Sequence, residues 1–137
     1  MARRQKRELP ELLFHFASRE RYNAILASQT VDPISNPSLG GKPGISFTDL
    51  DPRTVPWERI SMQNWKMLRP WRMEAFVAVP IRSVRRPRQL PAPQNHEWVT
   101  THSVPLGSGC FGGIRTTAKD GTVTYTLDDR PGRISTP

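Results

Sequence analysis

Proline and glycine recur so often along this chain that neither a long helix nor a long strand can form. The sequence holds 14 prolines and 9 glycines in 137 residues. Proline inside a helix removes a hydrogen bond and clashes with the preceding turn, and both residue types favour turns. We therefore expect an α+β domain of short strands and helices joined by stiff loops, and not a helical bundle. A chain of this length suits a single domain.

The ends of the chain differ from its middle. Residues 1–8 are basic, and residues 129–137 are rich in polar residues and proline. We therefore expect a disordered basic N-terminus and a flexible C-terminal tail around one domain at 9–128. Twenty Lys and Arg against 12 Asp and Glu give a formal net charge of +8. Such a charge favours an anionic partner such as nucleic acid, a phosphorylated ligand or a dinucleotide.

Several kinds of site are disfavoured by composition. The sequence has one cysteine, Cys110, so no intramolecular disulfide can form and no zinc site can be built from cysteine pairs. His96 and His102 lack a third ligand, so we expect loop and strand residues there and no metal. No apolar run approaches the ~20 residues that span a bilayer, so we expect a cytoplasmic protein with no membrane segment.

Apolar periodicity and turn signals predict alternating short strands and helices. Ser18 suits the N-cap of a helix whose Tyr22, Ile25 and Leu26 share one face. The expected elements are a strand at 12–17, a helix at 19–28, a turn-rich loop at 31–44, a strand at 45–48, a helix opened by Pro56 and stopped by Pro70, strands at 73–79 and 97–101, a basic linker at 82–94, and a hairpin of 113–119 with 122–127 joined by Asp120-Gly121.

One imidazole, His15, stands in the middle of the first apolar run. A histidine in such a place either holds a ligand at a strand end or is a buried polar group with a satisfied partner, and the second role is the more common one. Four segments that follow the expected order of elements favour the first role: Leu13–Ser18, Ile25–Ser28, Gly44–Pro52 and Asn95–Val99.

These segments, in this order, resemble the small bacterial toxin-type ADP-ribosyltransferases with a His-Tyr-Asp/Glu-like signature, and more distantly the diphtheria-toxin and poly(ADP-ribose) polymerase branch. The resemblance covers residues 11–113. It implies an ADP-ribosyltransferase-like domain at 9–128, built on a split β-sheet core with short flanking helices. It also implies NAD as the substrate from which ADP-ribose is taken.

The resemblance gives roles to particular residues. His15 would hold a ribose hydroxyl of NAD, and the backbone of Phe16 would hold the nicotinamide amide. Glu97 would be the catalytic carboxylate that stabilises positive charge on the ribose as the nicotinamide bond breaks. The residues expected at NAD are His15, Phe16, Ser18, Ser46, Phe47 and Thr48.

The chain departs from the family at Ser46, where related enzymes have a tyrosine that stacks on nicotinamide. Phe47 is next along the strand, and successive strand residues face opposite sides. Either the pocket lacks a stacking ring at this wall, or the alignment is wrong by one residue. Asp49 is expected to cap the turn that leads through Pro52.

A basic loop precedes Glu97 and is a candidate for acceptor recognition. Arg85, Arg86 and Arg88 could bind the phosphates of a nucleic acid or the pyrophosphate of NAD. They could also contact an acidic protein surface, or serve solubility alone. Asn95 stands two positions before Glu97 on the same strand face, where the resemblance places the residue that orients the acceptor.

We therefore expect a monomeric mono-ADP-ribosyltransferase that cleaves NAD and modifies a protein or nucleic acid. The family implies a toxin or effector, delivered into a target cell or neutralised by an immunity or antitoxin protein. The alternative is a non-catalytic basic protein that binds nucleic acid or nucleotides on the same fold. RNA 2'-phosphotransferases share this scaffold and NAD, and form a third class.

Overall fold

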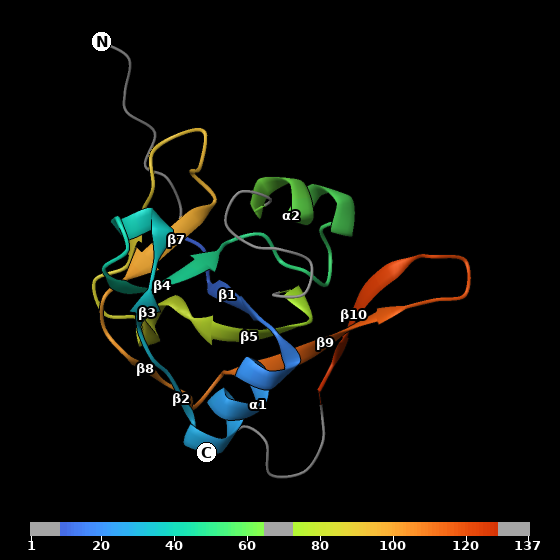
Figure 1. The fold of residues 1–137 in the computed structure, drawn as a ribbon, viewed down its shortest axis with the longest axis horizontal. Helices are drawn as coiled ribbons and strands as arrows, with labels where there is room; N and C mark the ends of the chain where they lie inside the picture. The colour runs from blue at the N-terminus through green and yellow to red at the C-terminus, as the bar shows by residue number, and fades with distance from the viewer. Residues whose placement is uncertain (1–8, 65–72, 129–137) are drawn as a thin grey trace.

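A computed structural model describes residues 9–64 and 73–128 and shows an α+β fold built on an antiparallel sheet (Figure 1). Within these ranges eight strands form one sheet in the order β10-β9-β5-β1-β4-β7-β6, with β3 paired to β4, and β2 pairs with β8 separately. The strands are β1 (Leu12–Ala17), β2 (Thr30–Val31), β3 (Ile34–Ser35), β4 (Pro43–Thr48), β5 (Ala75–Pro80), β6 (Arg88–Gln89), β7 (Glu97–Thr100), β8 (Val104–Pro105), β9 (Phe111–Thr117) and β10 (Val123–Leu127). The helices are α1 (Arg19–Ser28) and α2 (Trp57–Asn64), with 3-10 turns η1 (Pro37–Leu39) and η3 (Ile81–Ser83).

Strand β1 lies in the centre of the sheet and is buried on both faces. It pairs with β5 along its whole length, from Leu12 opposite Pro80 to Ala17 opposite Ala75. Leu13 and Ala17 belong to one apolar cluster and Phe14 and Phe16 to another, so alternate residues of β1 face opposite sides. This double burial explains why the first strand is almost entirely apolar in sequence.

The two helices cover opposite faces of this sheet (Figure 1). Helix α1 begins after Ser18, whose Oγ accepts a hydrogen bond from the Arg21 backbone N at 3.2 Å, and this confirms the expected N-cap. Tyr22 and Ile25 of α1 are buried in the cluster that holds Leu13. Helix α2 buries Ile60 in the other cluster.

Strands β1 and β4 are neighbours in the sheet but pair over a very short stretch. These neighbours are in register at a single pair, Phe14 opposite Thr48, whereas β4 continues with β7 over four pairs from Ile45–Thr100 to Thr48–Glu97. Beyond Phe14 the two strands therefore share no further ladder pair among the described residues. The two halves of the sheet therefore separate beside this pair, and the separation positions the site described below.

Two stretches expected to be loops contain regular structure. The segment 31–44 includes β3 and the turn η1, and its last two residues already belong to β4. The prediction of a loop without regular structure was therefore wrong. Asn36 caps η1, and Gly40 ends it with φ 66°, a left-handed conformation that glycine adopts easily. The linker 82–94 contains β6, which extends the sheet beside β7. Strands of two residues leave almost no periodicity in sequence, which is why they escaped prediction.

The remaining elements follow the sequence closely. The hairpin of β9 and β10 is confirmed, with Asp120-Gly121 at its tip. Helix α2 follows Pro56 as expected, but its expected stop at Pro70 lies outside the described residues. The expected disordered N-terminus at 1–8 and C-terminal tail at 129–137 also lie outside them.

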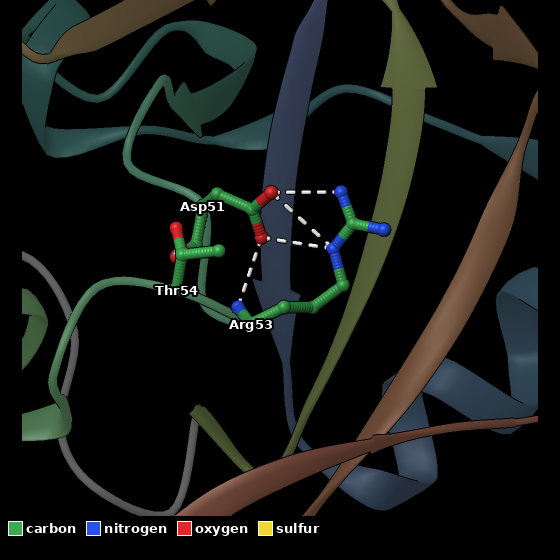
Figure 2. Close-up of polar contacts among 3 residues, drawn as sticks. All are labelled: Asp51, Arg53 and Thr54. Atoms are coloured by element: carbon green, nitrogen blue, oxygen red, sulfur yellow. Dashed lines mark hydrogen bonds and ion pairs between the residues drawn. The ribbon is translucent and has the colours of Figure 1, made fainter.

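The turn after β4 is organised by Asp51, which binds Arg53 (Figure 2). The Asp51 carboxylate accepts a hydrogen bond from the Arg53 backbone N at 2.9 Å and pairs with its guanidinium at 2.7 Å. Desolvation is the largest single influence on the pKa of Asp51 and raises it. The ion pair and hydrogen bonds with Arg53 together lower the pKa by more, so it lies below its usual range. Asp49 instead accepts from Trp98 Nε1 at 3.0 Å and contacts His96 Nδ1 at 2.7 Å, so the expected capping role of Asp49 was wrong.

Candidate functional site

A cavity of about 300 Å³ opens where β1 and β4 separate. It is lined by all the residues that the sequence placed at NAD or in catalysis: His15, Phe16, Ser18, Ser46, Phe47, Thr48 and Glu97. Those residues come from β1, the start of α1, β4 and the start of β7. A volume of this size is at the lower end of small-molecule sites.

His15 is neutral and has a defined tautomer in this cavity. Its Nδ1 lies 2.9 Å from the Ser46 carbonyl oxygen, and a carbonyl can only accept, so Nδ1 carries the proton. Nε2 then has a free lone pair that can accept a hydrogen bond from a hydroxyl. Burial lowers the pKa of His15 to about 4, outweighing the Ser46 bond that raises it, and the nearby Arg21 charge lowers it further.

Glu97 is held at one end by two hydroxyls. Its Oε2 accepts hydrogen bonds from Ser38 Oγ at 2.7 Å and from Ser46 Oγ at 2.8 Å, and the residue is only 8% exposed. Among the described residues no donor reaches Oε1. One carboxylate oxygen is therefore anchored, and the other is left to meet a ligand.

Asn36 fixes both serine donors. Its Nδ2 donates to Ser46 Oγ at 2.8 Å, and its Oδ1 accepts from the Ser38 backbone N at 2.8 Å. Asn36 is itself buried at 5% exposure. A buried amide with its partners satisfied holds a single geometry, so the carboxylate of Glu97 is preorganised by a connected network.

No aromatic ring is free to stack on a ligand among the residues that line the cavity. Phe14, Phe16 and Phe47 are each 4% exposed or less. Strand β4 keeps regular pairing with β7, with Ser46 opposite Val99 and Phe47 opposite Trp98, so the strand has no bulge that would turn Phe47 to the Ser46 side. Phe47 lies instead edge-on to the His15 ring, with centroids 5.8 Å apart.

The residues expected to recognise an acceptor do not line this cavity. Arg85, Arg86 and Arg88 are exposed around β6, on the far side of β7 from β4. Asn95 lies in a turn before β7 begins, so its expected place on the strand face of Glu97 was wrong. Its carbonyl oxygen accepts from Gln89 Nε2 at 2.6 Å, which ties the turn to β6.

Sequence reasoning missed Arg21, Asn36 and Ser38. Arg21 lines the cavity beside Ser18, and the two others hold Glu97 through the contacts above. The Asn-Pro-Ser order at 36–38 is a turn-capping signal that could have drawn attention to the loop. The link from Ser38 to Glu97 spans 59 residues of sequence, and no local pattern reveals such a contact.

Comparison with family models, with curated proteins and with solved structures finds no match for this chain. Residues 9–64 and 73–128 include no group of three His, Cys, Asp or Glu side chains placed to hold a metal ion. No helix in the same ranges has the length and apolar character needed to cross a bilayer. Function is therefore inferred from the geometry of the cavity.

Proposed function

We propose that this protein is an NAD-dependent ADP-ribosyltransferase whose active site is the cavity between β1 and β4. The observation that carries the proposal is the convergence of a neutral imidazole, His15, and an anchored carboxylate, Glu97, on a cavity of about 300 Å³. Such a cavity can take the nicotinamide riboside half of NAD, with the rest of the dinucleotide outside.

NAD supplies the reacting bond: the bond from ribose C1' to the nicotinamide nitrogen breaks, its electron pair leaves on neutral nicotinamide, and the acceptor nucleophile bonds to C1' and releases its proton. Positive charge on the ribose is stabilised by the carboxylate of Glu97 through its free Oε1, while Ser38 and Ser46 keep the other oxygen in place. His15 accepts a hydrogen bond from a ribose hydroxyl at Nε2, since its Nδ1 proton is committed to Ser46. Because its pKa is about 4, His15 stays an acceptor at neutral pH.

In the proposed enzyme, Ser46 stands at the position where related enzymes have a stacking tyrosine, and it has a different role. Its hydroxyl donates to Glu97, and its carbonyl orients His15, so one residue connects the two groups that would handle the ribose. The face of the nicotinamide ring then lacks an aromatic partner. This feature favours the second candidate, a protein that binds a nucleotide without cleaving it.

The exposed arginines around β6 provide an acceptor surface in the proposed enzyme. Arg85, Arg86 and Arg88 carry positive charge next to the strand that begins with Glu97. A phosphate backbone or an acidic protein surface would both suit them. Adding nucleic acid or cell lysate to the assay tells these acceptors apart.

The test is release of nicotinamide from NAD by the purified protein, together with NAD affinity by calorimetry. We expect Glu97→Gln to lower release by about 10²-fold or more with NAD affinity changed only a few-fold, because the carboxylate acts on charge that develops in the transition state. His15→Ala should weaken both. Glu11→Gln, which removes an exposed carboxylate, is the matched control and should behave as wild type.

Two results would overturn the proposal in different ways. NAD binding without release of nicotinamide, in the presence of lysate and nucleic acid, would leave the non-catalytic nucleotide-binding protein. Failure to bind NAD at all would remove both nucleotide functions for this cavity.

A further inference from the structure

Strand β10 forms one edge of the main sheet, at the right of Figure 1, and its outer side has no partner strand in residues 9–64 and 73–128. Open edges accept a further strand, so proteins commonly protect them with proline, charged side chains, bulges or a very short strand. The opposite edge, β6, follows this rule. It is two residues long, begins with the charged Arg88 and comes directly after Pro87.

Strand β10 has none of these protections. Its five residues, Val123–Leu127, include no proline and no charged side chain, and all five pair with β9 without a bulge. Leu127 is 52% exposed although it is a large apolar residue. The strand is therefore a neutral, partly apolar edge on a chain of net charge +8. Two copies can meet along it without placing like charges directly opposite each other.

The backbone groups of β10 that lack a partner can be identified from its pairing with β9. In an antiparallel pair, alternate residues turn their N–H and C=O groups to the same neighbour, and the residues between them turn theirs away. The Asp128 backbone N–H donates to the Gly112 carbonyl at 2.8 Å, and the Thr122 carbonyl accepts from the Ala118 N–H at 2.9 Å. The even-numbered residues thus bond to β9. The outward N–H and C=O groups belong to Val123, Tyr125 and Leu127.

The order of residues in β10 is the same in kind from either end: an apolar residue, threonine, tyrosine, threonine and an apolar residue. A two-fold axis through Tyr125 would place Tyr125 opposite its own copy and Val123 opposite Leu127. These are the residues with outward backbone groups, so this register pairs every one of them. It also sets Thr124 opposite Thr126, a favourable cross-strand pair.

We propose that β10 is a dimerisation edge, at which two copies of this chain join through antiparallel β10 strands centred on Tyr125 and form one continuous sheet. The self-complementary order of residues favours a second copy as the occupant, because an isologous contact uses the same patch on both subunits. The result is a dimer in place of the monomer expected from sequence. Strands β9, β5 and β1 separate β10 from β4, roughly 20 Å at the usual strand spacing, so this inference does not depend on the proposed function.

Sedimentation equilibrium over a range of protein concentrations tests the dimer, in about 0.15 M salt to screen the repulsion between basic chains. We expect the mass to rise with concentration from the chain mass of 15.6 kDa toward twice that value. Leu127→Lys, which puts a charge at the contact, should weaken association by at least about tenfold. Thr117→Lys is the matched control, because it adds the same charge to an exposed position of the same hairpin on β9, and it should change association only slightly.

Disulfide crosslinking tests the register. Across the proposed axis Thr124 and Thr126 form a non-hydrogen-bonded pair with Cα atoms about 4.5 Å apart, which a disulfide can span. An equimolar mixture of Thr124→Cys and Thr126→Cys, with oxidised glutathione as the oxidant, should form linked dimers that contain one chain of each. Either variant alone should crosslink at least about tenfold less, because residues of the same number lie diagonally, about 7–8 Å apart. The native Cys110 thiol is buried and adds little background.

Each outcome decides for or against the edge. A mass that stays at one chain up to the solubility limit overturns the dimer. Association that Leu127→Lys leaves intact, or crosslinks as abundant in the single variants as in the mixture, overturns the pairing of β10 in this register. The substituted side chains are exposed, so each variant should keep the urea midpoint of wild type, and a loss of association then belongs to the contact itself.

Discussion

The neutral His15 ring predicts a specific loss of stability as the pH falls. The pKa of His15 is about 4 in the folded protein and 6.5 when the ring is exposed in the unfolded chain. The unfolded state therefore binds more protons between these values. The free energy of unfolding has its full value with respect to His15 above pH 6.5, and it decreases as the pH falls toward 4. Each pKa unit corresponds to about 1.4 kcal/mol.

At pH 5 the unfolded His15 is mostly protonated and the folded His15 is not, which gives at most about 2 kcal/mol relative to pH 8. The ring keeps some solvent contact, which screens the effect, so we expect between about 1 and 2 kcal/mol. Urea unfolding at pH 8 and pH 5 measures it, with His15→Gln as the reference that cannot gain this proton. Subtracting one protein from the other removes the shared contribution of the carboxylates and of the other histidines.

A parallel loss of stability in wild type and His15→Gln between pH 8 and pH 5 would refute the reasoning. It would mean that the ring is solvated or paired in a way that keeps its pKa near 6.5. Nitrogen NMR of the ring gives an independent check, since Nδ1 should carry the proton and Nε2 should be bare at neutral pH.

Two further predictions concern stability. Tyr22→Phe should lower the free energy of unfolding by about 2 kcal/mol, because the Tyr22 hydroxyl donates to the buried Asp128 carboxylate at 2.6 Å; an unchanged urea midpoint would contradict this account. Gly113→Ala should cost about 1–3 kcal/mol, because a Cβ there would overlap the Phe76 ring. Gly107→Ala meets no heavy atom within 4 Å and should leave the thermal midpoint nearly unchanged, so equal effects at the two glycines would argue against the overlap.

The elements that the sequence predicted well are those with strong local signals. The first strand is a continuous apolar run because both faces of β1 are buried, and Ser18 marks the start of α1 through its cap. The hairpin of β9 and β10 is specified by its Asp-Gly turn. In each case a few neighbouring residues determine the outcome.

The candidate site was predicted in part for a similar reason. His15, Ser46 and Glu97 each lie on a strand that the sequence identified, so they fell into one cavity once the strands were paired. Asn36 was missed because its role depends on partners brought close only by the fold. Asn95 was misplaced because β7 starts two residues later than that role requires.

The position of Arg21 at the cavity was invisible from sequence for a different reason. An arginine near the start of a helix is ordinarily solvated, and the helix pattern places it away from the core. Arg21 lines the cavity because β1 and β4 separate and leave a space that residues of β1, β4 and α1 surround. Local pattern gives the direction of a side chain but not the shape of the space around it.

The contacts that hold Glu97 also set when a newly synthesised chain can complete the cavity. Glu97 contacts Ser46 across 51 residues and Ser38 across 59, and β1 is joined to β5 from far along the chain. Pairings of such high sequence separation form slowly, because the intervening chain must lose conformational entropy before the contacts can stabilise the fold. No growing chain that stops before β7 contains the carboxylate or the strand that carries it. Ligand binding in this cavity should therefore appear together with the folded sheet and not before it.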